Sequence, residues 1–228
     1  MKKDNRDGVS LLGGVPVPEH FSAEQLTAID TKAVAVIDTR VWDIFNRGHL
    51  AGSLNPLGGV GFLASVGSFV TVDEDIVLIV ERDRLDEVIR QLIRIGLDRV
   101  IGWASPATLS VALETIDGGD TIDEVAPGDV PAMRDAGAAM LDVRTTSECA
   151  EGMIAGAISI PYTRLIPRFA EVPEGEPIIV NCKGGGRSAA ACTMLARAGR
   201  TVVNLEGGYH AWLAALDAQS ASTPQATS

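Results

Sequence analysis

The chain has 228 residues, of which 46% are hydrophobic and 21% are charged, and its formal net charge is −11. This length allows one large domain or two domains of about 100 residues each. The negative charge argues against binding to nucleic acid or to anionic membrane surfaces, because both attract basic proteins. No apolar stretch approaches the ~20 residues of a membrane span, and the first residues show no signal-peptide pattern, so we expect a cytoplasmic protein.

The first half of the chain is predicted to alternate strands and helices. Residues 1–20 contain several glycines and prolines and are predicted to form a leader or linker. Ser22 and Gln25 have the spacing of a capping box, which predicts that a short helix begins there. Buried strands are predicted over 33–38, 76–80 and 99–101, and a helix over 85–95.

The pattern of the first half returns about a hundred residues later. Asp38 precedes Gly48 by the same spacing as Asp142 precedes Gly152 (38 to 48 and 142 to 152). Further strands are predicted over 138–143, 177–181 and 201–205. This internal repeat indicates a duplicated domain rather than a solenoid.

The repeat predicts an α/β fold of two small domains, each with a mostly parallel sheet flanked by helices on both faces. The predicted boundaries are a first domain over 21–104, a linker over 105–120, a second domain over 121–216 and a disordered tail over 217–228.

Cysteine occurs at three positions, Cys149, Cys182 and Cys192. An odd number without metal-binding spacing predicts neither a disulfide framework nor a zinc site. Cys192 lies within a predicted helix rich in Ala and Leu, where a small core residue is the simpler interpretation.

The strongest chemical signal lies in residues 176–199. A predicted strand leads into Cys182, three successive glycines and Arg187, and a helix follows. The glycines allow backbone amides to point toward one site, and the helix adds free N–H groups and the positive end of its dipole. These groups, with Arg187, favour the thiolate of Cys182. We therefore predict a reactive thiolate that carries or attacks an anionic compound, and a structural buried cysteine is the alternative.

Four segments of the second half occur in the order found in rhodanese domains. They are Asp142 to Arg144 with Glu148, Gly152 to Pro161, Cys182 to Ser188, and Leu205 to Trp212. On these motifs residues 121–216 resemble a catalytic rhodanese domain, and residues 21–104 resemble one more weakly.

The resemblance implies a sulfurtransferase with no metal and no organic cofactor. Cys182 would attack a sulfane-sulfur donor, hold the sulfur as a persulfide and pass it to a thiol or to cyanide. Arg187 would attract an anionic donor such as thiosulfate, and Ser188 would form a hydrogen bond near the sulfur. The loop that binds the substrate and the persulfide would comprise Lys183, Gly184, Gly185, Gly186, Arg187 and Ser188. Asp142 and Arg144 are predicted to be structural.

The first half lacks these catalytic features. Aligning its predicted strand over 76–80 with the strand before Cys182 places Glu81 near the position of the cysteine. No thiol or run of glycines follows, and an acidic side chain would repel an anionic donor. The first copy is therefore predicted to be degenerate and inactive.

The whole chain resembles the two rhodanese domains at the end of metallo-β-lactamase-fold persulfide dioxygenases. This likeness rests on residues 11–16, residues 92–100 and the second copy, whereas the iron-binding histidine pattern of the dioxygenase is absent. It implies a glutathione-type persulfide as a further donor and a separate persulfide dioxygenase as a possible partner.

Two other functions remain open. One is a non-catalytic rhodanese-like module for interaction or sulfur carriage. The other is a cysteine phosphatase or arsenate reductase, although the loops of those enzymes are longer than the four residues between Cys182 and Arg187.

Overall fold

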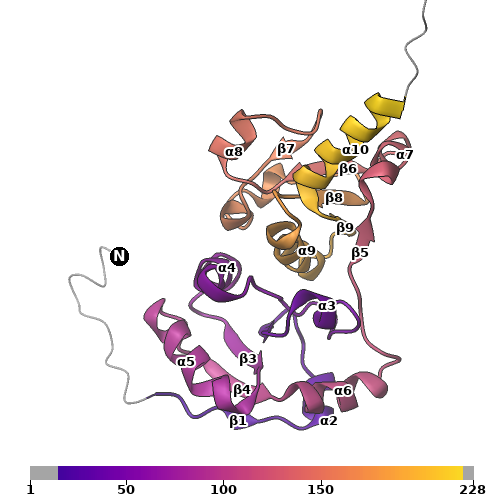
Figure 1. Cartoon of the computed structure of the whole chain (residues 1–228). Coiled ribbons are helices and arrows are strands. Elements are labelled where there is room, and N and C mark those ends of the chain that lie inside the picture. Colours follow the sequence, from indigo (N-terminus) through magenta and orange to yellow (C-terminus); the bar gives the residue numbers. More distant parts are fainter. Residues whose placement is uncertain (1–14, 223–228) are drawn as a thin grey trace, which may run out of the picture.

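The computed structural model describes residues 15–222 and contains two parallel β-sheets with helices between and around them (Figure 1). The first sheet has the strand order β1-β4-β3-β2 and the second has the order β5-β9-β8-β6-β7. The strands of the first sheet are β1 (Glu19–His20), β2 (Val34–Asp38), β3 (Asp75–Ile79) and β4 (Val100–Ala104). Those of the second are β5 (Asp123–Val125), β6 (Ala139–Asp142), β7 (Ile158–Ser159), β8 (Ile178–Asn181) and β9 (Val202–Leu205). The prediction of an α/β fold with parallel sheets is confirmed.

Helices cover both faces of each sheet, because successive side chains of a buried strand point to opposite faces and both sets are apolar. The helices of the first half are α2 (Ala23–Thr27), α3 (Trp42–Phe45), α4 (Phe62–Phe69), α5 (Leu85–Arg94) and α6 (Pro106–Glu114). Those of the second half are α7 (Val130–Asp135), α8 (Thr146–Ala150), α9 (Gly186–Arg197) and α10 (Gly208–Ser222). No helix within residues 15–222 is long and apolar enough to cross a lipid bilayer.

The two sheets repeat one another in register as well as in strand order. Ile37 pairs with Leu54 in an isolated bridge, and Leu141 pairs with Ile158 in the second sheet. Each residue of the second pair lies 104 positions after its counterpart in the first pair (37 to 141 and 54 to 158). The spacing that indicated a repeat in the sequence therefore corresponds to a repeat in the pairing of the strands.

The register also corrects the predicted counterpart of Cys182. Ile79 and Asn181 occupy the same place in the two sheets, since each pairs with the last residue of its neighbouring strand. The residue after each is Val80 in the first half and Cys182 in the second, and both are buried. The predicted counterpart, Glu81, lies one residue further and is exposed.

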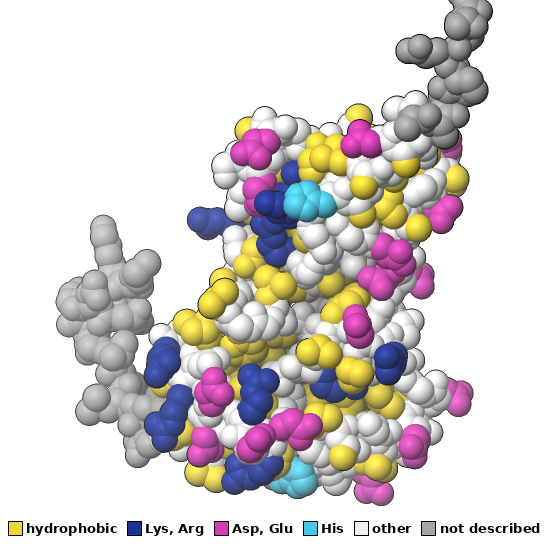
Figure 2. Space-filling model, in the orientation of Figure 1, with side chains coloured by type: hydrophobic (Ala, Val, Ile, Leu, Met, Phe, Trp, Pro, Cys, Tyr) yellow, Lys and Arg dark blue, Asp and Glu magenta, His cyan; other side chains and the backbone are white. Residues whose placement is uncertain are grey.

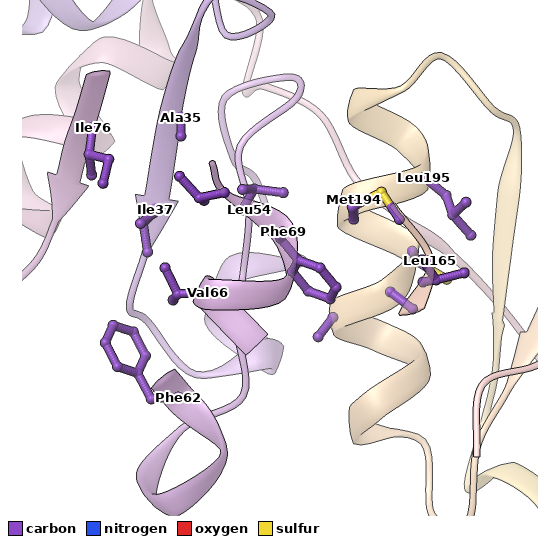
Figure 3. Close-up of a cluster of buried hydrophobic side chains, with 14 of the residues drawn as sticks. Ala35, Ile37, Leu54, Phe62, Val66, Phe69, Ile76, Leu165, Met194 and Leu195 are labelled. Atoms are coloured by element: carbon purple, nitrogen blue, oxygen red, sulfur yellow. The ribbon is translucent and has the colours of Figure 1, made fainter. Parts of the chain in front are cut away.

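One hydrophobic core fills the layer between the two sheets and contains residues of both halves. Helix α4 faces helix α9 across this layer, and Phe69 points from α4 toward α9 and Met194 (Figure 3). The rings of Phe69 and Tyr162 meet edge to face with centroids 6.3 Å apart. The halves therefore bury apolar surface against each other.

Hydrogen bonds and an ion pair also join the two halves. Arg197 of α9 donates to the carbonyl oxygen of Thr31 at 2.8 Å and forms an ion pair with Glu74 at 2.8 Å. The backbone N–H of Asn55 donates to Thr193 Oγ1 at 3.2 Å. These contacts, with the shared core, connect α9 to the first half along its length.

The segment 105–120, predicted as a linker, contains helix α6. Ser105 caps this helix by accepting a hydrogen bond from the N–H of Thr108, and Pro106 stands at its first position, where a missing N–H costs nothing. Leu109 and Ala112 are buried in a core shared with α2 and the first sheet. The prediction of a linker is wrong for α6, because this helix covers the outer face of that sheet.

The predicted ends of the chain differ from the structure as well. Strand β1 lies within the predicted leader and pairs with β4 at the edge of the first sheet. Helix α10 continues through Ser222, so the predicted disordered tail over 217–228 begins inside a helix. Residues 1–14 and 223–228 lie outside the described residues. They include the first four positions of the segment 11–16, on which part of the family resemblance rests.

Candidate active site

Cys182 follows the last residue of β8, where the second sheet ends and the chain turns into α9. The turn requires a glycine at position 185, because its φ of +95° is a left-handed conformation that other residues rarely adopt. Only 1% of Cys182 is exposed, whereas Lys183, Gly184 and Gly186 are exposed. The thiol therefore lies beneath the loop that covers it.

Two hydrogen-bond donors contact the sulfur of Cys182. The backbone N–H of Gly185 donates to Sγ at 3.2 Å, and Ser188 Oγ lies 3.4 Å from Sγ. Ser188 Oγ also lies 2.8 Å from the carbonyl oxygen of Gly185, and its single hydroxyl proton can serve only one of these acceptors at a time. Both donors are placed to stabilise a negative charge on the sulfur.

The first turn of α10 holds the backbone of the cysteine loop. The N–H of Tyr209 donates to the carbonyl oxygen of Cys182 at 2.7 Å, and the N–H of His210 donates to that of Lys183 at 3.1 Å. A Cβ atom at Gly208 would overlap the carbonyl oxygen of Cys182, so only glycine fits there. Gly208 belongs to the segment Leu205 to Trp212, to which no role was assigned from the sequence, and the structure shows that it allows this close approach.

Arg187 is bound by Glu148 of helix α8. Its Nη1 and Nη2 donate to the two carboxylate oxygens of Glu148 at 2.7 and 2.6 Å. The same carboxylate accepts the N–H and the hydroxyl of Thr145, at 3.0 and 2.8 Å, in a capping box. The hydrogen bonds from Arg187 hold the pKa of Glu148 well below its usual value, and those to Glu148 raise the pKa of Arg187. The guanidinium that was predicted to attract a donor is therefore paired with a carboxylate.

Asp142 and Arg144 form a buried ion pair behind the loop. Arg144 Nη2 lies 2.7 Å from Asp142 Oδ2 and donates to the carbonyl oxygen of Gly152, also at 2.7 Å. The guanidinium carbon lies 4.0 Å from the ring centroid of Tyr209, at the start of α10. Arg144 thus joins the strand end, the loop before β7 and helix α10.

Among the described residues, the first half contains the ion pair and the carbonyl contact, without the ring contact. Arg40 Nη2 lies 2.6 Å from Asp38 Oδ2 and donates to the carbonyl oxygen of Gly48 at 2.9 Å. Because this half has no cysteine, the set does not depend on the thiol chemistry. Its presence in both halves of the chain agrees with the prediction that Asp142 and Arg144 are structural.

A cavity of about 610 Å³ lies between the two halves next to the cysteine loop. Gly186 and Ala189 of α9 form one wall, and Trp42, Leu57 and Arg84 are among the residues of the opposite wall. Figure 2 shows Lys and Arg side chains gathered beside a histidine on the second half, with hydrophobic side chains between the halves.

The other two cysteines are buried outside the cysteine loop. Burial raises the pKa of the Cys192 thiol well above its usual value, and burial also raises that of Cys149, whose Sγ accepts a hydrogen bond from Ser159 at 3.4 Å. All three cysteines are free. Within residues 15–222 no group of three His, Cys, Asp or Glu side chains is placed to bind a metal ion.

Comparison with known proteins identifies a family and several relatives. The rhodanese-like domain family matches residues 126–215. The chain is 38% identical to a sulfurtransferase of Allochromatium vinosum over 74 residues, which cover 32% of this chain and 69% of that protein. It is 41% identical over 90 residues to thiosulfate sulfurtransferase 16, chloroplastic, of Arabidopsis thaliana, covering 34% and 75%. The crystal structure of a rhodanese-related protein from Thermoplasma volcanium is 30% identical, covers 41% of this chain and 92% of that one, and has a TM-score of 0.38.

Proposed function

This chain belongs to the rhodanese family of sulfurtransferases, and from that premise we propose that it transfers sulfane sulfur through a persulfide on Cys182. The observation that carries the proposal is the placement of the Cys182 sulfur at the junction of a strand and a helix, with Gly185 N–H and Ser188 Oγ directed at it. Both donors stabilise the thiolate that attacks the sulfur donor and that is regenerated at the end of the cycle.

The proposed cycle has two displacement steps. In the first, the Cys182 thiolate attacks the outer sulfur of thiosulfate; a new S–S bond forms, the S–S bond of the donor breaks, and sulfite leaves with the electron pair. In the second, cyanide attacks the terminal sulfur of the persulfide, thiocyanate forms, and the thiolate of Cys182 is regenerated. No oxidant, metal or organic cofactor enters the balance.

A glutathione-type persulfide is the second proposed donor, and its sulfur would be transferred with release of the glutathione thiolate. The donor must reach a cysteine that is 1% exposed beneath the loop, so a narrow terminal sulfur suits the site better than a bulky group. A persulfide dioxygenase is the proposed partner, since both enzymes would act on the same low-molecular-weight persulfide. We place this activity in the cytoplasm.

We further propose that the chain is a tandem rhodanese with a degenerate first copy. The strand order of the first sheet, which the second sheet repeats with β7 added at its edge, and the shared Asp–Arg–Gly contacts support this. Val80 occupies the position of Cys182 in the first copy, so this copy has no nucleophile. The proposed first copy extends from β1 through α6, and the second extends from β5 through α10.

The proposal is tested by a transfer assay with each donor in turn and cyanide as acceptor. Cys182→Ser is expected to lose transfer with both donors, whereas Cys149→Ser, the same exchange outside the loop, is expected to retain it. Circular dichroism of both variants establishes that they are folded. A folded Cys182→Ser variant with wild-type transfer would exclude the proposed mechanism. Inactivity of the folded wild type with both donors would favour an interaction module, and hydrolysis of a phosphoester would favour a phosphatase.

A further inference from the structure

The carboxylate of Glu148 accepts hydrogen bonds from two residues. Thr145 donates its N–H and hydroxyl to Oε2, and Arg187 donates to both oxygens. The side chains of Glu148 and Arg187 are 26% and 22% exposed, so the pair is partly shielded from solvent at the edge of the loop. An ion pair with two parallel hydrogen bonds fixes both the position and the net charge of the guanidinium.

The first half of the chain shows that the Glu148–Arg187 ion pair is not among the contacts that both halves share. Counted by the repeat of 104 positions, the residues equivalent to Thr145 and Glu148 are Val41 and Ile44. Ile44 is exposed and can neither cap a helix by hydrogen bonding nor bind a guanidinium. Thus the copy without a cysteine keeps the buried Asp–Arg–Gly contacts and lacks the glutamate. Glu148 is therefore present in the half that has the cysteine loop, and the fold of the other half does not require a glutamate there.

The charge of Glu148 matters for an anion that approaches Cys182. Arg187 belongs to the cysteine loop and directly precedes Ser188, whose Oγ lies 3.4 Å from Sγ of Cys182. An unpaired guanidinium there would attract a dianion such as thiosulfate more strongly than a persulfide, whose reacting end carries one charge. Paired with Glu148, Arg187 offers little net charge to either donor.

Resting on the proposed sulfur transfer, we propose that Glu148 is a specificity-determining positioning residue. It holds Arg187 at the edge of the cysteine loop and neutralises it, so that the site discriminates against donors whose reacting group is doubly charged. The donor class that fits the site is the hydropersulfides, and thiosulfate is the weaker donor.

The variant that tests this inference is Glu148→Gln. Glutamine can still act in a capping box and has nearly the same size, so the charge is the main thing removed. KM and kcat are measured for thiosulfate and for glutathione persulfide, with cyanide as acceptor. We expect KM for thiosulfate to fall about fivefold or more, with kcat and the KM for glutathione persulfide changing by less than about twofold. The kcat/KM for thiosulfate should also become more sensitive to salt, because an exposed attraction is screened.

Glu74→Gln is the matched control, because Glu74 has the same type of partners at the other end of α9. Its carboxylate accepts the N–H and hydroxyl of Thr71 and binds Arg197. The donor preference of this variant is expected to equal that of the wild type. Adding Glu148→Gln to an Arg187→Gln variant is expected to have no effect on the KM for thiosulfate, since the charge that Glu148 neutralises is gone.

Three results would overturn the inference. The first is an equal loss of kcat with both donors in Glu148→Gln, and the second is an unchanged KM for thiosulfate in that variant. The third is an equal fall of the KM for thiosulfate in the Glu74→Gln control. If Glu148→Gln does not fold, the salt dependence of the wild type replaces it. The kcat/KM for thiosulfate is then expected to change less than about twofold between about 50 and 500 mM salt, and a steep decrease would contradict a neutralised Arg187. Transfer that persists in Cys182→Ser would instead refute the proposed function itself.

Discussion

Gly208 shows how closely the cysteine loop depends on single residues. It has a φ of +61°, and a side chain there would overlap the carbonyl oxygen of Cys182 and approach the N–H groups of Gly184 and Gly185. We expect Gly208→Ala to lower the free energy of unfolding by more than about 2 kcal/mol, through backbone strain and steric overlap. Urea unfolding measures this loss, and sulfur transfer should decrease with it.

Gly128→Ala is the control for that prediction. No atom lies within 4 Å of a Cβ built at Gly128, and its φ is not positive. Its stability is expected to stay within about 0.5 kcal/mol of the wild type. Equal stabilities of the two variants would show that the loop yields to α10 more easily than the structure indicates.

The cysteine loop itself was predictable from its residues, because a strand, three glycines, an arginine and a helix are adjacent in the chain. The partner of Arg187 was not, because Glu148 is 39 positions away. The spacing of Thr145 and Glu148 indicates a helix cap, and no local pattern shows that the same carboxylate reaches the loop. The role of Gly208 could not be predicted either, because Cys182, which it contacts, is also distant from it in the sequence.

At the scale of elements, strands β2, β3, β4, β6, β8 and β9 and helices α5 and α9 were predicted to within a few residues, because their apolar runs are short and bounded by glycine or capping residues. Strands β1, β5 and β7 and helices α3, α4, α7 and α8 were not predicted. Helix α6 was missed, although α10 follows β9 in the second half as α6 follows β4 in the first. The sequence also could not show that Val80, rather than Glu81, is the counterpart of Cys182, because only the pairing of the strands fixes this alignment.

His49 connects the segment between α3 and α4 to the segment after α6, and the burial of its side chain leads to a prediction about pH. Its backbone exchanges two hydrogen bonds with Asp120, and its ring stacks on Phe45 with centroids 3.9 Å apart. The side chain is 2% exposed, Nδ1 has no hydrogen-bond partner within the described structure, and burial lowers its pKa from 6.5 to about 4.

Because the unfolded chain takes up a proton at His49 near pH 6.5 and the folded chain does not until about pH 4, stability falls as the pH decreases between these values. We expect the free energy of unfolding to be about 2 kcal/mol lower at pH 5 than at pH 7 from this residue alone. In His49→Phe, which can still stack on Phe45, that decrease should be smaller by the same amount. Urea unfolding of both proteins at the two pH values measures it, and parallel decreases would contradict the prediction.

At the scale of the whole molecule, the sequence left open whether the two halves pack together or move on a hinge. The shared core answers this, because α4 and α9 bury apolar side chains against each other (Figure 3). The apolar residues of both helices were visible in the sequence, but their amphipathic pattern does not reveal which surface covers them.

Phe69 tests this packing. Phe69→Ala is expected to reduce the free energy of unfolding by about 3–5 kcal/mol, since it removes a buried aromatic ring from the layer between the sheets. Loss of circular dichroism and loss of transfer activity should coincide in one urea transition, in the variant as in the wild type. Phe21→Ala, on the outer face of the first sheet and only partly buried, should cost less. Two separate transitions in the wild type would show that the halves unfold independently.

The most direct test of the central claim is the intact mass of the protein after treatment with glutathione persulfide or thiosulfate in the absence of an acceptor. We predict that the wild type gains the mass of one sulfur atom, that peptide mapping places it on Cys182, and that cyanide removes it. Cys182→Ser should gain none under the same conditions. A folded wild type that stays unmodified, or sulfur carried equally by Cys149 or Cys192, would contradict the assignment of Cys182 as the sulfur carrier.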